Sequence, residues 1–130
     1  MHELTFSTKE QFEVIDITDR VRAIIKKSKG KQCIVYTPHA TAAIVINEGW
    51  DPDIGKDLLD ALDKAVPLHA GYRHDKVDNN AAAHIKAAIL GPSETLLIEN
   101  GKLILGRWQN IFFVELDGPR NRRKVYVKIF

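Results

Sequence analysis

Four histidines inside the chain carry the chemistry to hold a transition metal: His39, His69, His74 and His84. A neutral imidazole offers a lone pair at pH 7 without the cost of burying a charge, which makes histidine the commonest ligand for such metals. No two of these residues form an H-x-x-x-H pair, so their spacing alone favours ordinary surface or core histidines. A metal site would require distant segments to meet in the folded chain.

The neighbours of three of these histidines are suited to a site. His74 is followed by Asp75 and Asp78, whose carboxylates could add ligands or fix the imidazole tautomer. His84 lies among alanines, whose small side chains let a helix approach a neighbouring backbone closely, and His39 lies between two threonines. Three imidazoles that converge with one coordination position left open would form a catalytic zinc-like site.

A further candidate lies at the end of an apolar run. Residues 36–48, YTPHATAAIVINE, are apolar in the middle and polar at both ends, with Glu48 last. Functional residues concentrate where strands pass into loops. We therefore expect Glu48 to point into a site, where its carboxylate could act as a base.

The segment ELDGPRNRRK, residues 115–124, places Arg120, Arg122, Arg123 and Lys124 within five positions. Guanidinium groups match phosphate oxygens in a bidentate fork, and such a cluster repels itself unless an anion or carboxylates neutralise it. The segment therefore predicts an anion site in which Arg120 and Arg122 are candidate catalytic residues. The alternative is a charged edge strand that resists aggregation.

The segment GRWQN, residues 106–110, places Trp108 and Gln109 at a predicted strand end. An indole could pack on a ligand ring while the amide reads its polar edge, so both are candidate cofactor-binding residues. The alternative is that Trp108 is a core or subunit-contact residue.

The periodic spacing of apolar and polar residues, together with turn residues, predicts the helices and strands that must position these side chains. Asn100-Gly101 between two apolar runs predicts a two-residue hairpin. In residues 51–66, Asp51 is placed to cap a helix whose first residue is Pro52. The expected fold is α+β, a mostly antiparallel β-sheet sandwich with helices over residues 18–29, 51–66 and 79–90 and strands over residues 2–8, 11–17, 31–37, 42–48, 94–100, 102–106, 110–117 and 123–130.

The bulk properties limit the class of protein. A chain of 130 residues fits a single domain, residues 1–130, with its own core, and the one cysteine, Cys33, reads as a small buried hydrophobe. The net charge of +2 is too small to favour a nucleic-acid partner. The sequence shows neither a signal peptide nor a membrane span, so we expect a cytoplasmic protein with no membrane partner.

These segments together resemble the YjbQ family, whose members are described as secondary thiamine-phosphate synthases. The resemblance covers residues 34–127 and is carried by TPHATAAIVINE, YRHD, NNAAAHIKAAILGPS, NGKLILGRWQ and ELDGPR. Position 40 is alanine where the family pattern has threonine. The resemblance implies a small α+β homotrimer with a cleft near subunit contacts, and it implies His39, His74 and His84 as ligands of a divalent metal, zinc or magnesium. His69 matches no family position.

The activity that the resemblance implies joins a pyrimidine-methyl diphosphate to a thiazole phosphate and releases pyrophosphate. Such a transferase needs cations for the leaving group and binds a phosphorylated small molecule. Two alternatives remain open. One is a metal-dependent hydrolase with Glu48 or Glu115 as base, and the other is a non-enzymatic trimer that binds a metal or an anionic metabolite.

Overall fold

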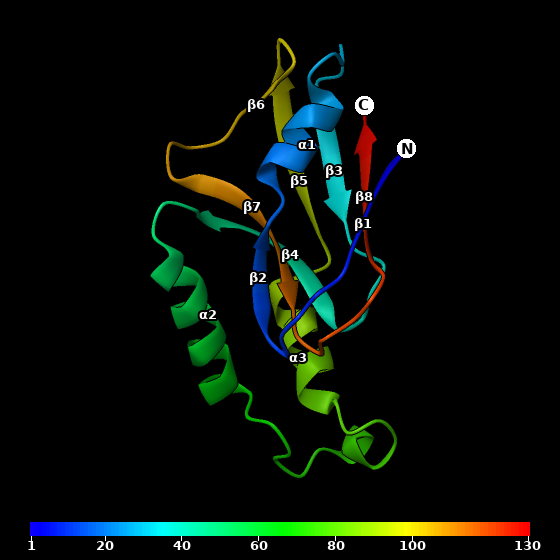
Figure 1. The fold of residues 1–130 in the computed structure, drawn as a ribbon, viewed down its shortest axis with the longest axis vertical. Helices are drawn as coiled ribbons and strands as arrows, with labels where there is room; N and C mark the ends of the chain where they lie inside the picture. Colours follow the sequence, from blue (N-terminus) through cyan, green and yellow to red (C-terminus); the bar gives the residue numbers. More distant parts are fainter.

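The computed structural model describes all 130 residues and contains two antiparallel sheets, three α-helices and one short 3₁₀ helix, η1 (Figure 1). The elements follow in the order β1 (His2–Phe6), β2 (Glu13–Asp16), α1 (Thr18–Ile25), β3 (Gln32–Tyr36), β4 (Ala42–Glu48), α2 (Pro52–Ala65), η1 (Arg73–Lys76), α3 (Ala81–Leu90), β5 (Ser93–Glu99), β6 (Lys102–Leu103), β7 (Gln109–Glu115) and β8 (Arg123–Ile129).

One sheet has five strands in the order β1-β8-β3-β5-β6, and the other has three in the order β2-β7-β4. Every pairing is antiparallel. The β5–β6 turn has positive φ at Asn100 (52°) and Gly101 (73°), as the hairpin prediction requires. The predicted α+β fold with mostly antiparallel sheets and three helices is therefore confirmed.

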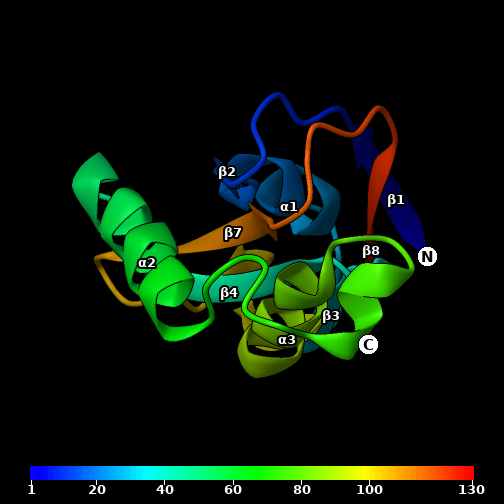
Figure 2. The same cartoon turned by 90° about the horizontal axis from the view of Figure 1, so that it is seen from below.

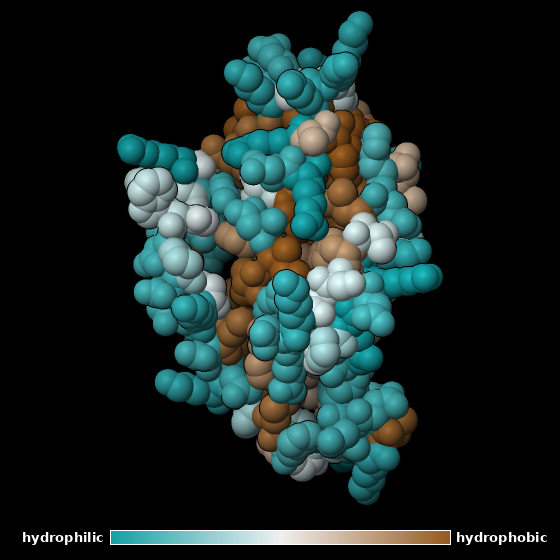
Figure 3. Space-filling model, viewed as in Figure 1, coloured by the Kyte–Doolittle hydropathy of each residue, from teal (hydrophilic) through white to brown (hydrophobic).

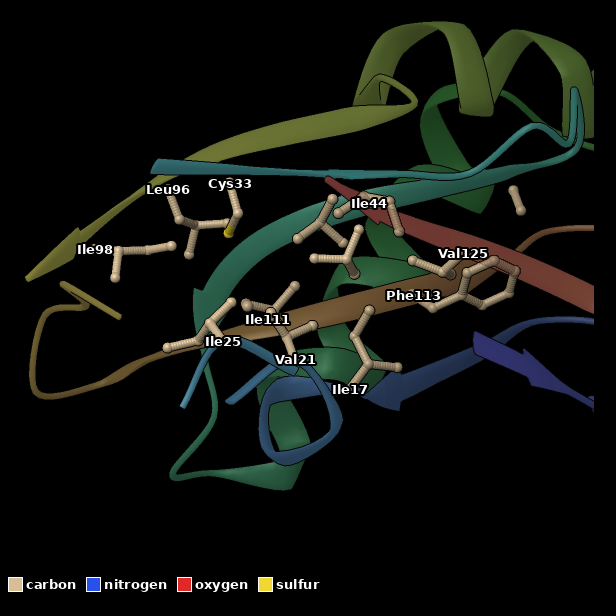
Figure 4. Close-up of a cluster of buried hydrophobic side chains, with 13 residues drawn as sticks. Ile17, Val21, Ile25, Cys33, Ile44, Leu96, Ile98, Ile111, Phe113 and Val125 are labelled. Carbon is tan, nitrogen blue, oxygen red and sulfur yellow. The ribbon is translucent and has the colours of Figure 1, made fainter. Parts of the chain in front are cut away.

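The main core lies between the two sheets and is closed on one side by α1 (Figure 4). It takes alternate residues from each strand because successive side chains point to opposite faces. Val35 and Val125 come from the larger sheet, and Ile44 and Phe113 come from the smaller one. Cys33 is buried in the same core, and desolvation raises the pKa of its thiol, which confirms its role as a small apolar residue.

Helix α3 covers the other face of the three-stranded sheet. Ala83 and Ala87 of α3 pack with Ala43, Val114 and Leu116 in a second buried cluster. The small side chains on both surfaces allow the helix to lie close to β4, as the alanine-rich sequence predicts. Because His84 directly follows Ala83 in α3, this packing also fixes the position of His84.

Helix α2 is attached more loosely. Asp51 caps it by accepting a hydrogen bond from the Asp53 N–H at 2.9 Å, and Pro52 is its first residue, so the predicted start is confirmed. None of its residues is buried, however, and it lies beside the three-stranded sheet, with a cavity between the helix and residues of all three strands (Figure 2). Lys86 of α3, almost fully buried, forms an ion pair of 3.1 Å with Asp63 of α2. None of the helices is long and apolar enough to cross a membrane.

Candidate functional site

His74 and His84 come together in the folded chain. His74 lies in η1 and His84 lies in α3, and their ring centroids are 4.9 Å apart with the ring planes at 89°. The two rings line an open hollow of about 450 Å³ together with Tyr72, Arg73 and Ile85. Two of the three predicted ligands are therefore neighbours, although they lie ten positions apart in the sequence.

Asp75 connects the two elements that carry this imidazole pair. Its Oδ1 atom accepts a hydrogen bond of 3.0 Å from the N–H of Ala81, the first residue of α3. This bond satisfies one of the N–H groups that a helix start leaves free. The Oδ2 atom of Asp78 lies 3.9 Å from Nε2 of His74, whereas the Oδ2 atom of Asp75 lies 3.9 Å from Nδ1 of His69. Asp75 therefore positions the pair through the backbone, and Asp78 is the carboxylate that faces it.

His39 has a separate partner. Its Nε2 atom accepts a hydrogen bond of 2.8 Å from the N–H of Lys124, so the neutral ring carries its proton on Nδ1. Desolvation and the charges of Arg123 and Lys124 lower the pKa of His39, and the charge of Glu115 opposes them only in part. The neutral imidazole therefore holds the start of β8 in place, and its Nε2 lone pair is already used.

The single chain does not complete a three-ligand metal centre. No three His, Cys, Asp or Glu side chains lie where together they could hold a metal ion. Two imidazoles leave a tetrahedral ion short of protein donors, since catalytic zinc sites usually take three. The centre of His39, His74 and His84 therefore stays a prediction, and one chain supplies only the last two as neighbours.

The basic turn divides into two parts with different environments. Nη2 of Arg120 lies 2.9 Å from Oδ2 of Asp117, and the same oxygen accepts a hydrogen bond of 2.8 Å from Nδ2 of Asn80. Asn80 is the N-cap residue of α3, one helical turn before His84, so Arg120 is linked to the helix that carries His84. Arg122 is exposed and forms no ion pair. Both predicted arginines are therefore available to an anion.

Arg123 and Glu115 belong to the core, which corrects their assignment as anion ligand and possible base. Glu115 is fully buried, and its carboxylate accepts hydrogen bonds from Nε and Nη2 of Arg123 and from the Thr8 hydroxyl. Desolvation alone would raise the pKa of Glu115, but the bonds from Arg123, Thr8 and the Asp117 N–H outweigh it and lower that pKa. The pair fixes the turn between β7 and β8.

Glu48, Trp108 and Gln109 form a second group. Glu48 ends β4 and is paired in register with Gln109, the first residue of β7. Six residue steps along β4 separate Glu48 from Ala42, which is about 20 Å of extended strand. The side-chain carbonyl of Gln109 accepts a hydrogen bond of 2.8 Å from the Gly106 N–H, so it stabilises its own turn. The structure therefore separates these three residues from the His39 end of β4.

Two residues beside these groups were not among the candidates identified from the sequence. Asn80 is one, and its Oδ1 atom is buried without a hydrogen-bond partner. Its position four residues before His84 on one helix was the available signal. Trp50 is the other, and its ring lies 5.6 Å from that of Trp108 in an edge-to-face arrangement. No local pattern connects two tryptophans that lie 58 positions apart in the sequence.

The lowered pKa of His39 predicts a loss of stability in mild acid. In the unfolded chain this group titrates near 6.5, while the folded chain favours the neutral ring. The contribution of the neutral His39 ring to the free energy of unfolding is therefore fully present above pH 6.5. It is lost as the pH falls below that value, because protonation of Nε2 breaks the hydrogen bond from the Lys124 N–H. The free energy of unfolding, measured with urea, should change less between pH 7.5 and pH 5.5 for His39→Gln than for the parent protein. The control His2→Gln, at an exposed histidine without a side-chain partner, should match the parent. A His39→Gln difference as large as the parent's would contradict the assignment.

Comparisons with known proteins give one consistent result. Residues 2–130 match the family described as UPF0047 protein YjbQ-like. A UPF0047 protein of Archaeoglobus fulgidus is 49% identical over 123 residues, 95% of this chain and 96% of that protein. The UPF0047 protein YugU of Bacillus subtilis is 43% identical over 129 residues, 97% of this chain and 96% of that protein.

Solved structures agree with the sequence comparisons. A crystal structure from Clostridium acetobutylicum, described as an uncharacterized conserved protein of the yjbq/upf0047 family, has a TM-score of 0.94 and 45% identity, with all of both chains covered. A YbjQ-like protein of unknown function from Sulfolobus solfataricus has a TM-score of 0.94 and 41% identity, and the match covers 98% of this chain and 94% of that one. The fold, the length and the sequence thus agree, and the chain belongs to the UPF0047 (YjbQ-like) family.

Proposed function

We propose that this protein is a transferase of the thiamine-phosphate synthase type. It would bring a pyrimidine-methyl diphosphate and a thiazole phosphate together, form the bond between the methylene carbon and the thiazole nitrogen, and release pyrophosphate with the electron pair of the broken carbon–oxygen bond. We place this activity in the cytoplasm and in a homotrimer, as the family resemblance and the sequence imply.

The observation that carries the proposal is the link between Arg120 and the imidazole pair. Oδ2 of Asp117 accepts hydrogen bonds from both the guanidinium of Arg120 and the amide of Asn80, and Asn80 lies one helical turn before His84. The guanidinium keeps N–H donors that Asp117 does not use, and Arg122 adds a second cation nearby in the sequence. Preorganised cations are what a departing pyrophosphate requires, since its negative charge grows as the carbon–oxygen bond breaks.

A divalent metal would be held by His74 and His84 together with a donor from a neighbouring chain of the trimer. Imidazole donors favour zinc over magnesium, which prefers oxygen ligands. Such an ion would supply further positive charge for phosphate oxygens. Because one chain does not complete the centre, the protein's own contribution is the positioning of Arg120 and the two rings. Glu48, Trp108 and Gln109 are not needed for this site.

The experiment is a turnover assay on the purified protein with both substrates. Thiamine phosphate is followed by chromatography and pyrophosphate by a coupled assay, with zinc, with magnesium and after dialysis against a chelator. Equimolar appearance of both products supports the proposal. Release of phosphate from either substrate alone would instead support a metal-dependent hydrolase. Metal or pyrophosphate binding without turnover would support the non-enzymatic trimer.

A further inference from the structure

A cavity of about 410 Å³ lies between α2 and the three-stranded sheet. Its walls are apolar: Val14, Val45 and Phe112 come from the three strands, and Ile54 and Leu58 come from α2. Hydrophobic side chains are visible along the sheet side of α2 in Figure 3. The volume falls within the roughly 300–1,000 Å³ typical of small-molecule sites. The space exists because α2 stands away from the sheet and buries none of its own residues.

The contact between α2 and the sheet keeps this space open at a fixed width. Gly55 faces Val14 of β2, and a Cβ atom at Gly55 would lie 3.5 Å from the Val14 side chain. At the other end of α2, the buried Lys86 holds Asp63, and its ammonium lies 4.4 Å from the ring centroid of Phe12, another wall residue. The helix is therefore held at both ends with the cavity between them.

The charge around the cavity is negative. Glu13, Asp16, Glu48 and Asp51 line it, against the single cation Lys56. The Lys56 side chain is 78% exposed, and its ammonium lies 3.9 Å from Asp53, a carboxylate that does not line the cavity. The four lining carboxylates therefore outnumber the one lining cation. A ligand with an apolar body and a positive charge would match both the walls and the rim.

Only one of these carboxylates is free of partners. Asp16 accepts hydrogen bonds with both oxygens, Glu13 accepts two from backbone N–H groups, and Asp51 caps α2. Glu48 is half-buried and has no hydrogen-bond or ion-pair partner in the chain. A half-buried carboxylate without a partner loses part of its hydration and gains nothing in return. Glu48 is therefore the group that a ligand cation would contact.

Both tryptophans of the chain stand at the same end of the cavity. Trp50 lies between two lining residues, Gly49 and Asp51, and is 78% exposed. The Gly49 N–H donates a hydrogen bond of 2.8 Å to the carbonyl of Trp108, whose ring packs against Trp50. Indole faces attract organic cations through the ring quadrupole. The guanidinium of Arg107 already lies over the Trp108 ring, 4.7 Å from its centroid, so Trp50 is the indole that can add to the attraction that Glu48 provides.

We propose that the cavity beneath α2 binds a small organic cation with an apolar body, such as a substituted amine, whose charge lies between Glu48 and Trp50 and whose body lies between α2 and the sheet. This site is separate from the imidazole pair and Arg120. Binding of a cation in this cavity does not depend on whether the protein has the proposed transferase activity.

The test uses n-alkyltrimethylammonium ions as probes and the fluorescence of Trp50 and Trp108 as readout, with calorimetry for affinity. Hexyltrimethylammonium is expected to bind about tenfold more tightly than the butyl homologue, because two more methylene groups leave water. Hexanoate, of opposite charge, is expected to show no binding. Glu48→Gln should weaken binding of the hexyl cation about three- to tenfold.

Two further variants separate the cavity from the surface. Leu58→Phe fills the space and should abolish binding of the cations; Leu59→Phe serves the same purpose if the first variant fails to fold, as judged by circular dichroism. Asp60→Asn removes an equal charge from the exposed face of α2 and should leave the affinity unchanged. Equal binding of hexanoate, an unchanged affinity in Glu48→Gln, or the absence of saturable binding would overturn the proposal.

Discussion

Replacement of Arg123 by alanine is expected to lower the free energy of unfolding by about 3–5 kcal/mol. The guanidinium of Arg123 is buried and forms three hydrogen bonds, two to Glu115 and one of 2.9 Å to the Thr41 hydroxyl. Its removal leaves the fully buried carboxylate of Glu115 without its counter-charge. Urea denaturation followed by circular dichroism at pH 7.5 measures the change.

The neighbouring residue provides a matched control. Arg122 carries the same charge one position earlier but is exposed and unpaired, so Arg122→Ala should change the stability by less than about 0.5 kcal/mol. The double variant Glu115→Leu with Arg123→Met replaces both ions by apolar side chains of similar size. It should recover most of the loss, because no unpaired charge remains buried. If Arg123→Ala and Arg122→Ala lowered the free energy of unfolding equally, the buried pair of Arg123 and Glu115 would contribute no more to stability than an exposed arginine.

The contrast between these two arginines shows what the sequence could have revealed. Val125 and Val127 alternate with polar residues in β8, and the phase that buries them also points Arg123 inward. The alternation was a usable signal, but the run of four cations suggested a single surface cluster. The carboxylate that makes the burial possible is Glu115, in the preceding strand. Only its position opposite Arg123 in the fold identifies the two as a pair.

Local signals predicted the elements well but not how closely they pack. The Asn100-Gly101 turn and the Asp51 cap depend on a few adjacent residues, and both were predictable because turn and cap geometry is local. The apolar residues Ile54, Leu58, Leu62 and Val66, spaced four positions apart, also indicate a helix in this segment, and the structure confirms it. This periodicity does not tell how far the helix lies from the sheet, since that distance depends on Gly55 and Lys86, and the cavity was therefore not foreseen.

The same limit applies to the candidate site. Residue types selected His74 and His84 as well as His39, and the fold brings the first two together. It directs His39 to a backbone N–H, because the loop before β4 lies beside the start of β8. Such a contact joins residues 85 positions apart, so no spacing rule could distinguish it from metal ligation.

The second large effect is expected at Arg120. Replacement of Arg120 by glutamine should weaken binding of pyrophosphate about 10- to 100-fold, which corresponds to the loss of a charged hydrogen-bond donor. The side chain is half-exposed and is oriented by Asp117, which Asn80 in turn holds. An arginine fixed in this way loses little conformational freedom when an anion binds, so its removal costs affinity directly. Isothermal titration with pyrophosphate at constant ionic strength measures the change.

Arg22 is the matched control, because it forms the same i,i+3 ion pair with Asp19 and its side chain is 54% exposed, against 51% for Arg120. It lies on α1, so Arg22→Gln removes an equal charge at an equally exposed position and should leave the affinity for pyrophosphate unchanged. If both variants weaken binding equally, the anion responds to net charge alone, and the linked set of Arg120, Asp117 and Asn80 has no role in recognition. A loss confined to Arg120→Gln, and reproduced in part by Asn80→Ala, would show that the anion requires a guanidinium held in one orientation beside His84.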